Sequence, residues 1–304
     1  MLYDLHLHSF YSDGEERPKR IFDRALASKV RGIAITDHNG IHQKTKQIVA
    51  KVKRCNIDAF EGIEISSQMS YGNNDISLHI LGYSLDFNAK NLNKNLKKTI
   101  LGYEMRAKQI IKKCNKLGIP INYNKLRKQS NEFYISRNTI AKEILKYRKI
   151  TLKEALKIAF VDEKENWFLS PFQVISLIKE SGGMPVLAHP GRLLPQLLKQ
   201  SPKSILEQLI DCGLRGIEVF YPKHTKSEIN ELLRLANKYN LIITGGTDYH
   251  GPNISPLTKI GVRGITAKDF QQFKNALQET SNLRPTTPSY LRHFTYPTLK
   301  RQTV

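Results

Sequence analysis

Two histidines and an aspartate lie close together near the start of the sequence, in the stretch YDLHLHSFYSDG at residues 3–14. If this stretch contains a β-strand, His6 and His8 project to the same side of the sheet, because side chains alternate along a strand. Two imidazoles at a strand end, with the carboxylate of Asp13 nearby, can bind a divalent ion. A lone His-x-His pair is also often incidental, so the distribution of the other histidines and acids must decide between these two interpretations.

Residues of the same chemical types follow most of the other apolar runs that read as strands. They are Asp37 and His38 after 32–36, Glu64 after 59–63, His189 after 184–188, and Asp248 and His250 shortly after 241–244. His79 is the poorest fit, because it lies near the start of the run 78–83 rather than after it. In a closed or nearly closed β/α barrel the C-terminal ends of the strands meet on one face, which carries the active site. The pattern therefore predicts one polar site at that face.

The candidate ligands are imidazoles and carboxylates without a thiolate, and this set suits Mn²⁺, Zn²⁺ or Fe²⁺. So many ligands exceed the needs of one tetrahedral ion but are enough for two or three ions that share carboxylates. Each motif also has a plain structural alternative. Asp37 can cap a helix and leave His38 exposed, Glu64 can pair with a lysine, and residues 189–191 can form a simple turn. The convergence of all the motifs on strand ends favours a metal centre.

Short apolar runs alternate with longer amphipathic ones, which is typical of an α/β fold built from βα units. The predicted strands are 2–5, 32–36, 59–63, 78–83, 184–188, 216–220, 241–244 and 260–264. The predicted helices of this part include 18–29, 171–181 and 227–239. The second of these helices has Ser170 as its N-cap and Pro171 at its first position.

Residues 89–169 interrupt this alternation with predicted helices at 98–117, 137–147 and 151–160, which indicate an all-helical insertion. The insertion holds 20 Lys and Arg against 7 Asp and Glu, so it contributes +13 to the formal charge of +21. Concentrated positive charge attracts polyanions, although a lysine-rich composition throughout the proteome explains it equally well. The chain then divides into a first barrel part at 1–88, the insertion at 89–169, a second barrel part at 170–283 and a tail at 284–304.

The bulk composition is that of a globular protein. A chain of 304 residues can bury a large core. No apolar run is long enough to cross a bilayer, and the first residues lack a basic-then-apolar signal. The three cysteines, Cys55, Cys114 and Cys212, are far apart and predict neither a disulfide framework nor a cysteine zinc site. We expect a cytoplasmic protein that does not contact membranes, and the sequence indicates no obligate protein partner.

An ordered set of motifs resembles one known family. The motifs are DLHLHSFYSDG, AITDH, EGIE, LHILGY, GGMPVLAHPGR, GIEVFYPKHT and GGTDYHG, within residues 1–89 and 168–265. In order and spacing they resemble the PHP (polymerase and histidinol phosphatase) family of metal-dependent phosphoesterases. The resemblance implies a distorted (β/α)7 barrel with Glu64 as a bridging carboxylate. The implied metal ligands are His6, His8, Asp13, His38, Glu64, His79, His189, Asp248 and His250.

A helical insertion after LHILGY is similar to the subgroup of nucleoside 3′,5′-bisphosphate phosphatases, trimetal 5′→3′ exoribonucleases and cyclic-phosphate dihydrolases. Two positions depart from the family pattern. Asn39 stands where the family commonly has an acidic residue after TDH, and Thr139 in SRNTIA stands where the subgroup usually has a histidine. The second departure puts the rate or the specificity in doubt, but the implied metal ligands are intact.

The resemblance implies two or three divalent ions, with Mn²⁺ expected before Zn²⁺ or Fe²⁺. Clustered dications make hydroxide available near neutral pH and withdraw charge from a phosphoryl oxygen, so we expect a metal-activated hydroxide and no protein nucleophile. We expect Arg192 and Arg137 to bind the phosphate oxygens, because a guanidinium matches phosphate geometry. Alternatively, Arg137 is an ordinary exposed charge on a helix. His224 either contacts substrate or caps a helix.

We therefore expect an enzyme that hydrolyses phosphate esters of nucleotides or of short 5′-phosphorylated RNA. The aromatic residues of the insertion either stack on bases or form its small core, and they are Tyr103, Tyr123, Phe133, Tyr134 and Trp167. Histidinol phosphate or a cyclic phosphodiester is an alternative substrate for the same metal centre. A nucleic-acid-binding module without catalytic activity is the alternative from another functional class.

Overall fold

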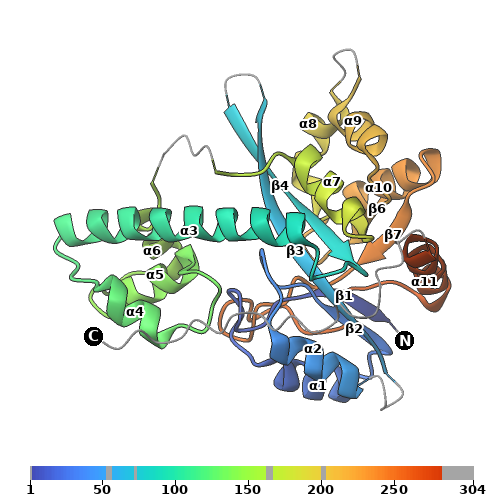
Figure 1. Cartoon of the computed structure of the whole chain (residues 1–304). Helices are drawn as coiled ribbons and strands as arrows, with labels where there is room; N and C mark the ends of the chain where they lie inside the picture. The colour runs from blue at the N-terminus through green and yellow to red at the C-terminus, as the bar shows by residue number, and fades with distance from the viewer. Residues whose placement is uncertain (1, 53–56, 72–73, 162–166, 200–202, 283–304) are drawn as a thin grey trace.

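Seven strands form one sheet in chain order in the computed structural model, which describes residues 2–52, 57–71, 74–161, 167–199 and 203–282 (Figure 1). The strands are β1 Tyr3–Leu7, β2 Gly32–Ile35, β3 Asp58–Tyr71, β4 Asn74–Tyr83, β5 Met184–Leu187, β6 Gly216–Phe220 and β7 Ile242–Gly245. The segment after β7 nearly closes the sheet into a barrel, since Leu7 pairs with Tyr249. The amide of Asp248 also donates to the carbonyl of His6 at 2.8 Å. The expected seven-stranded barrel is confirmed.

Strand β4 is the reason that the barrel is distorted. It pairs antiparallel with both β3 and β5, whereas the other neighbouring strands are parallel. An antiparallel strand begins at the rim where its parallel neighbours end. His79 lies in the middle of β4, opposite Ser66 of β3, and its carbonyl accepts the amide of Ala188 at 3.0 Å, directly after the end of β5. A residue inside β4 therefore lies at the rim where its parallel neighbour β5 ends.

The predicted strand at 260–264 is wrong. Residues 260–263 form turns, and only Ile265 pairs with β1, through two hydrogen bonds of 3.0 Å with Tyr3. Gly261 adopts a left-handed φ of 83° that an extended strand does not allow. Its amide donates to the buried carboxylate of Asp4 at 2.9 Å, so these residues tie a loop to β1 rather than adding an eighth strand.

Helices surround the barrel on the outside (Figure 1). They are α1 Pro18–Ala27, α2 Gln43–Val52, α7 Pro171–Glu180, η2 Pro190–Leu193, α8 Leu194–Leu198, α9 Ile205–Cys212, α10 Lys226–Lys238 and α11 Ala267–Asn282. Helix α7 begins as predicted, with Ser170 as N-cap in a capping box and Pro171 in its first turn.

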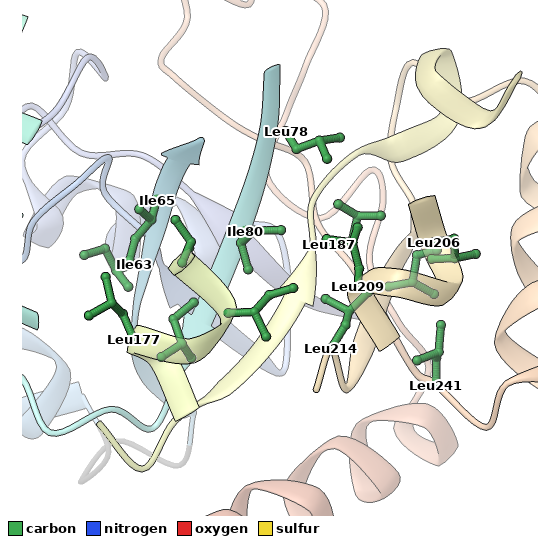
Figure 2. Close-up of a cluster of buried hydrophobic side chains, with 14 of the residues drawn as sticks. Ile63, Ile65, Leu78, Ile80, Leu177, Leu187, Leu206, Leu209, Leu214 and Leu241 are labelled. Atoms are coloured by element: carbon green, nitrogen blue, oxygen red, sulfur yellow. The ribbon is translucent and has the colours of Figure 1, made fainter. Parts of the chain in front are cut away.

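The largest core cluster lies between the sheet and these helices (Figure 2). Leu177 of α7 packs over Ile63, Ile65 and Ile80 of β3 and β4, and Leu187 continues the same layer on β5. All are buried, and each such side chain contributes about 1.5–3 kcal/mol of transfer free energy. Close-packed aliphatic residues between the sheet and the outer helices therefore support the strands that carry the site.

The described part of the insertion lies to one side of the barrel (Figure 1) and forms four helices, α3 Lys90–Lys116, α4 Tyr123–Gln129, α5 Arg137–Ile144 and α6 Leu152–Ile158. Helix α3 begins at Lys90 and not at the predicted residue 98. Its first turns bury Leu92 and Leu96 in the barrel core, whereas Ile110 and Cys114 join a separate cluster made by the insertion alone. One long helix thus connects the two cores.

Some expectations fall on parts of the chain that the structure does not describe. The tail at 284–304 and Cys55 lie outside the described residues. Within the described ranges, none of the helices combines the length and the apolar character that spanning a bilayer requires.

Candidate metal centre

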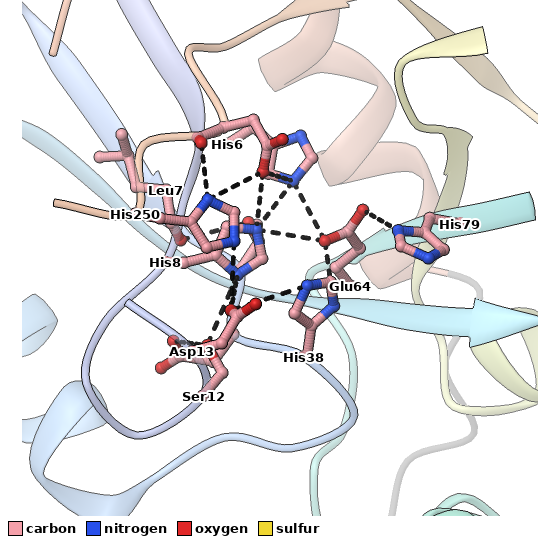
Figure 3. Close-up of polar contacts among 12 residues, drawn as sticks. His6, Leu7, His8, Ser12, Asp13, His38, Glu64, His79 and His250 are labelled. Atoms are coloured by element: carbon pink, nitrogen blue, oxygen red, sulfur yellow. Dashed lines mark hydrogen bonds and ion pairs between the residues drawn. The ribbon is translucent and has the colours of Figure 1, made fainter. Parts of the chain in front are cut away.

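The carboxylate of Glu64 lies at the centre of a ring of imidazoles at the C-terminal rim of the barrel (Figure 3). The predicted strand end at residue 63 is wrong, because β3 continues to Tyr71 and Glu64 lies inside it. Glu64 is three residues past Glu61, the partner of the last residue of β2, and its side chain is buried. Its Oε2 atom is 3.3 Å from Nε2 of His6, 3.1 Å from Nε2 of His8 and 3.2 Å from Nδ1 of His38. Its Oε1 atom is 2.8 Å from Nδ1 of His79 and 3.0 Å from Nε2 of His189.

Two more carboxylates complete the cluster. Oδ1 of Asp248 lies 3.1 Å from Nε2 of His8 and 3.5 Å from Nε2 of His6. Oδ1 of Asp13 lies 3.1 Å from Nε2 of His250 and 3.8 Å from Nε2 of His38. The structure thus brings together all nine residues whose role as metal ligands the sequence predicted.

Three overlapping groups within this cluster have the geometry of a metal site. They are His8, Asp13, His38 and His250; His6, His8, Glu64 and Asp248; and His38, Glu64 and His79. In each group the ligand atoms lie within 4.8 Å of one another. His8, His38 and Glu64 each belong to two groups, as expected for ligands of ions that lie side by side. The donor set contains nitrogen and oxygen only, which suits divalent ions of intermediate hardness.

Three buried atoms of the cluster have no hydrogen-bond partner. They are Oδ1 of Asp13, Nδ1 of His38 and Oε2 of Glu64. Buried polar atoms are almost always hydrogen-bonded in proteins, so an unsatisfied atom needs an explanation. Each of the three atoms belongs to a residue of one or two of the groups above. Cations between them would satisfy all three, and the residues present therefore fit divalent metal ions.

The charges in the cluster are strongly coupled. Burial alone would raise the pKa of Glu64, but His38, His79 and His6 hold it well below its usual range. Burial disfavours a charged His8, yet Asp248 and Glu64 raise its pKa to about 10. At His38, burial outweighs Glu64 and Asp13 and lowers the pKa to about 4. Since a ligating imidazole must be neutral, protons and metal ions compete for the same atoms of His8.

The sequence alternative of Asp37 as a helix cap is wrong, since α2 begins only at Gln43. Asp37 is buried and accepts hydrogen bonds from the amide of Ser9 at 2.7 Å, from its hydroxyl at 2.7 Å and from the hydroxyl of Ser12 at 2.8 Å. It therefore fixes the loop between His8 and Asp13, while His38 faces the cluster.

Glu218 on β6 is a site residue that the sequence analysis did not single out. It is buried, and its carboxylate lies 3.0 and 3.3 Å from Nδ1 of His6 and accepts the backbone amide of His189 at 2.8 Å. His189 adopts a left-handed φ of 31°, which is unusual for a residue with a side chain. Glu218 thus orients one ring and holds the strained backbone of another. An acidic residue inside an otherwise apolar strand was the signal in the sequence.

The two arginines predicted to bind phosphate have different surroundings. Arg192 follows His189 in η2 and is exposed, near Glu228. Arg137 is half-buried, and its guanidinium donates to the carbonyls of Ala159 at 3.1 Å and Leu156 at 3.0 Å. These bonds link α5 to the end of α6. A role for either arginine in binding substrate stays a prediction.

His224, the third residue predicted to contact substrate, is buried. Its Nδ1 lies 2.8 Å from the carbonyl of Val219, and its Nε2 accepts the amide of Gly191 at 3.1 Å. Both ring nitrogens are therefore engaged by the backbone. A side chain at position 191 would come within 2.6 Å of the ring, so the glycine and the histidine fit each other closely. In this conformation His224 supports the turn that carries His189.

This geometry predicts the effect of His224→Asn. We expect the free energy of unfolding to fall by about 1–3 kcal/mol, because a buried backbone amide or carbonyl loses its partner. Urea denaturation of the metal-loaded protein measures the change, and His42→Asn, at a partly exposed ring, is the control. Unchanged stability together with a large rise in KM would instead support direct contact with substrate.

The two departures from the family pattern both lie where the insertion meets the barrel. Asn39, with a left-handed φ of 54°, accepts the amide of Ser66 at 3.1 Å and donates to the hydroxyl of Tyr134 at 3.2 Å. Thr139 donates its hydroxyl to Glu132. Burial raises the pKa of Glu132 to about 7. Asn39 and Thr139 both hydrogen-bond within the protein in this structure.

Comparison with known proteins gives three kinds of similarity. The chain is 26% identical over 83% of its length to a phosphoribosyl 1,2-cyclic phosphate 1,2-diphosphodiesterase of Eggerthella lenta, of which the match covers 95%. It is 28% identical over 82% of its length to a 3′,5′-nucleoside bisphosphate phosphatase of Chromobacterium violaceum, covering 87% of it. It is 29% identical over 82% of its length to a 5′-3′ exoribonuclease of Haemophilus influenzae, covering 90% of it.

A solved structure shares the fold. An amidohydrolase from Chromobacterium violaceum, solved with bound sulfate and no metal, matches 92% of this chain and 97% of its own with a TM-score of 0.74 at 23% identity. Residues 4–155, half of the 304-residue chain, match the PHP domain. The chain therefore belongs to the PHP domain family.

Proposed function

We propose that this protein is a metal-dependent phosphoesterase that hydrolyses phosphate esters of nucleotides or of short RNA. The observation that carries the proposal is the convergence of six imidazoles and three carboxylates on one rim, with three of their buried atoms left without a hydrogen-bond partner. Structural ion pairs do not need so many histidines in one place. Metal binding does, because each ion takes several neutral nitrogen or carboxylate ligands.

The cluster has ligands for two or three divalent ions, and we propose Mn²⁺ as the first choice over Zn²⁺ or Fe²⁺. His8, Asp13, His38 and His250 would hold one ion, and His6, His8, Glu64 and Asp248 a second. A third would lie among His38, Glu64 and His79. His189 lies next to Oε1 of Glu64, the oxygen that also faces His79. Divalent ions at such a site lower the pKa of a bound water and stabilise charge on a phosphoryl oxygen.

The side chains of the chain itself would position the substrate. His79 and His189 are the most exposed members of the cluster, at 27% and 25%, so the phosphate would approach from their side. Arg192 follows His189 and is our first candidate for binding a non-bridging oxygen. Arg137 is the second, and it would have to exchange its carbonyl partners for the phosphate.

The relatives and the charge of the insertion support a nucleotide or RNA substrate. Two of the relatives are named for a nucleoside bisphosphate and for RNA. The insertion carries +13, which would favour an anionic chain over a small monoester. A cyclic phosphate is the second candidate, because the relative named for such a substrate is covered over 95% of its length. We expect the enzyme in the cytoplasm, without an obligate protein partner.

Metal analysis coupled to an assay panel tests the proposal. We expect freshly purified protein to contain two or three equivalents of metal, to lose activity in a chelator, and to recover it with Mn²⁺. The panel is a nucleoside 3′,5′-bisphosphate, a 5′-phosphorylated RNA oligomer, a cyclic phosphodiester and histidinol phosphate, each at rising salt. A metal-loaded protein that hydrolyses none of them would contradict the proposal. Turnover of histidinol phosphate alone would overturn the substrate class.

A further inference from the structure

Asp13 differs from the candidate ligands on strands in its support. Glu64 and His79 are carried by paired strands, whereas Asp13 lies in the turns between β1 and α1. The backbone of this loop is tied by the amides of Ser12 and Gly14, which both donate to the carbonyl of Ser9, at 3.0 and 3.1 Å. These bonds fix the path of the loop but not the rotation of the Asp13 side chain.

The insertion supplies the missing contact. Nδ2 of Asn138, in the first turn of α5, donates to Oδ2 of Asp13 at 3.1 Å. The other oxygen, Oδ1, is the atom that faces His250 at 3.1 Å and that has no hydrogen-bond partner. A carboxylate with one oxygen bound in this way can rotate little, so its second oxygen stays directed at the imidazoles.

Contacts of α5 and of Phe133, which precedes it, hold this part of the insertion against the loop. The amide of Phe133 donates to the carbonyl of Tyr11 at 2.9 Å. The ring of Phe133 also packs on Gly40 so closely that a side chain there would come within 2.8 Å of it. Further along α5, Lys142 pairs with Glu15 at 3.3 Å. The insertion therefore contacts the loop on both sides of Asp13.

The neighbours of Asn138 have other partners. Arg137 donates to carbonyls at the end of α6, and Thr139 donates to Glu132. Glu132 also accepts the amide of Ser136, the N-cap of α5, at 2.9 Å, which fixes the start of the helix. Of these three residues in the first turn, Asn138 is the one that reaches a candidate metal ligand.

We infer that Asn138 is a positioning residue that orients Asp13 for metal binding, so that the insertion forms part of the metal centre. The inference rests on the role proposed above for Asp13. It concerns one of the three groups, formed by His8, Asp13, His38 and His250. The group of His6, His8, Glu64 and Asp248 is built entirely from the barrel and does not depend on Asn138.

The test is Mn²⁺ binding by the full-length protein without substrate, measured by calorimetry and by electron paramagnetic resonance. Asn138→Leu keeps the size of the side chain and removes its donors, and Asn138→Ala serves if the leucine variant does not fold. Lys142→Met, on the same helix, removes a contact with the same loop that does not involve a candidate ligand. Circular dichroism melting confirms that each variant is folded.

We expect Asn138→Leu to weaken one Mn²⁺ site by roughly 10- to 100-fold, the usual effect of removing a group that orients a ligand. The affinity of the other Mn²⁺ sites should stay unchanged, and the electron paramagnetic resonance spectrum should shift toward that of isolated Mn²⁺ ions. Lys142→Met should bind Mn²⁺ as the wild type does. Equal weakening of all Mn²⁺ sites, or wild-type Mn²⁺ binding by a folded Asn138 variant, would overturn this inference and leave the proposed function standing. A wild-type protein that binds no Mn²⁺ would overturn both this inference and the proposed function.

Discussion

We expect Glu64→Gln to reduce metal-dependent hydrolysis on the order of 10³-fold or more. The carboxylate lies within 3.3 Å of a nitrogen of five histidines, and an amide would give up one of its two anionic oxygens. Bound metal contributes several kcal/mol of transition-state stabilisation, and about 4 kcal/mol corresponds to roughly 10³ in rate. Steady-state kinetics at saturating Mn²⁺, with metal analysis of the same sample, measure both effects.

The matched control is Glu61→Gln, the same chemical change three residues earlier on β3. Glu61 lies an odd number of residues from Glu64, so its side chain projects to the other side of the strand. We expect the control to keep wild-type activity and metal content. If Glu64→Gln retained both, Glu64 would not be a shared ligand, and the proposed arrangement of ions would have to be abandoned.

The second large effect is expected for Glu218→Gln, which should weaken Mn²⁺ binding by roughly 10- to 100-fold. Glu218 serves Nδ1 of His6 and the amide of His189 with two acceptor oxygens. Glutamine has one acceptor, so its NH₂ group must face one of these donors. Reversing the tautomer of His6 would relieve the conflict but would place a proton on Nε2, the nitrogen that faces Glu64 and Asp248.

Isothermal titration of the metal-free variant with Mn²⁺ checks this prediction. Glu231→Gln, at a partly exposed position on α10 paired with Arg234, is the control and should bind as the wild type does. Burial disfavours a charged His6, but Glu218 is the largest of the groups that raise its pKa. A variant that binds Mn²⁺ normally would show that Glu218 only packs in the barrel.

The sequence by itself determined the barrel and the residues gathered at its rim. Strand positions followed from apolar runs of four to six residues, and the ligands followed from what came directly after those runs. These signals are local, because a buried strand must be apolar and a polar residue at its end marks the rim. The end of β3 was nevertheless wrong, because β3 continues through Glu64 to Tyr71. Helix α7 was predicted with its cap for the same reason, since Ser170 and Pro171 act on the first turn alone.

Tertiary structure decided what depends on pairing between distant segments. His79 fitted poorly as a ligand because the sequence does not reveal that β4 runs antiparallel and begins at Asn74 rather than at residue 78. The sequence left His224 between substrate contact and a helix cap, and its backbone partners Val219 and Gly191 are set by how β6 and η2 pack. The partners of Asn138 and Glu218 could not be assigned from local pattern either, although an acid inside an apolar strand marked Glu218 as unusual. Each acts by a hydrogen bond to a residue more than a hundred positions away, and such a bond exists only once the chain has folded.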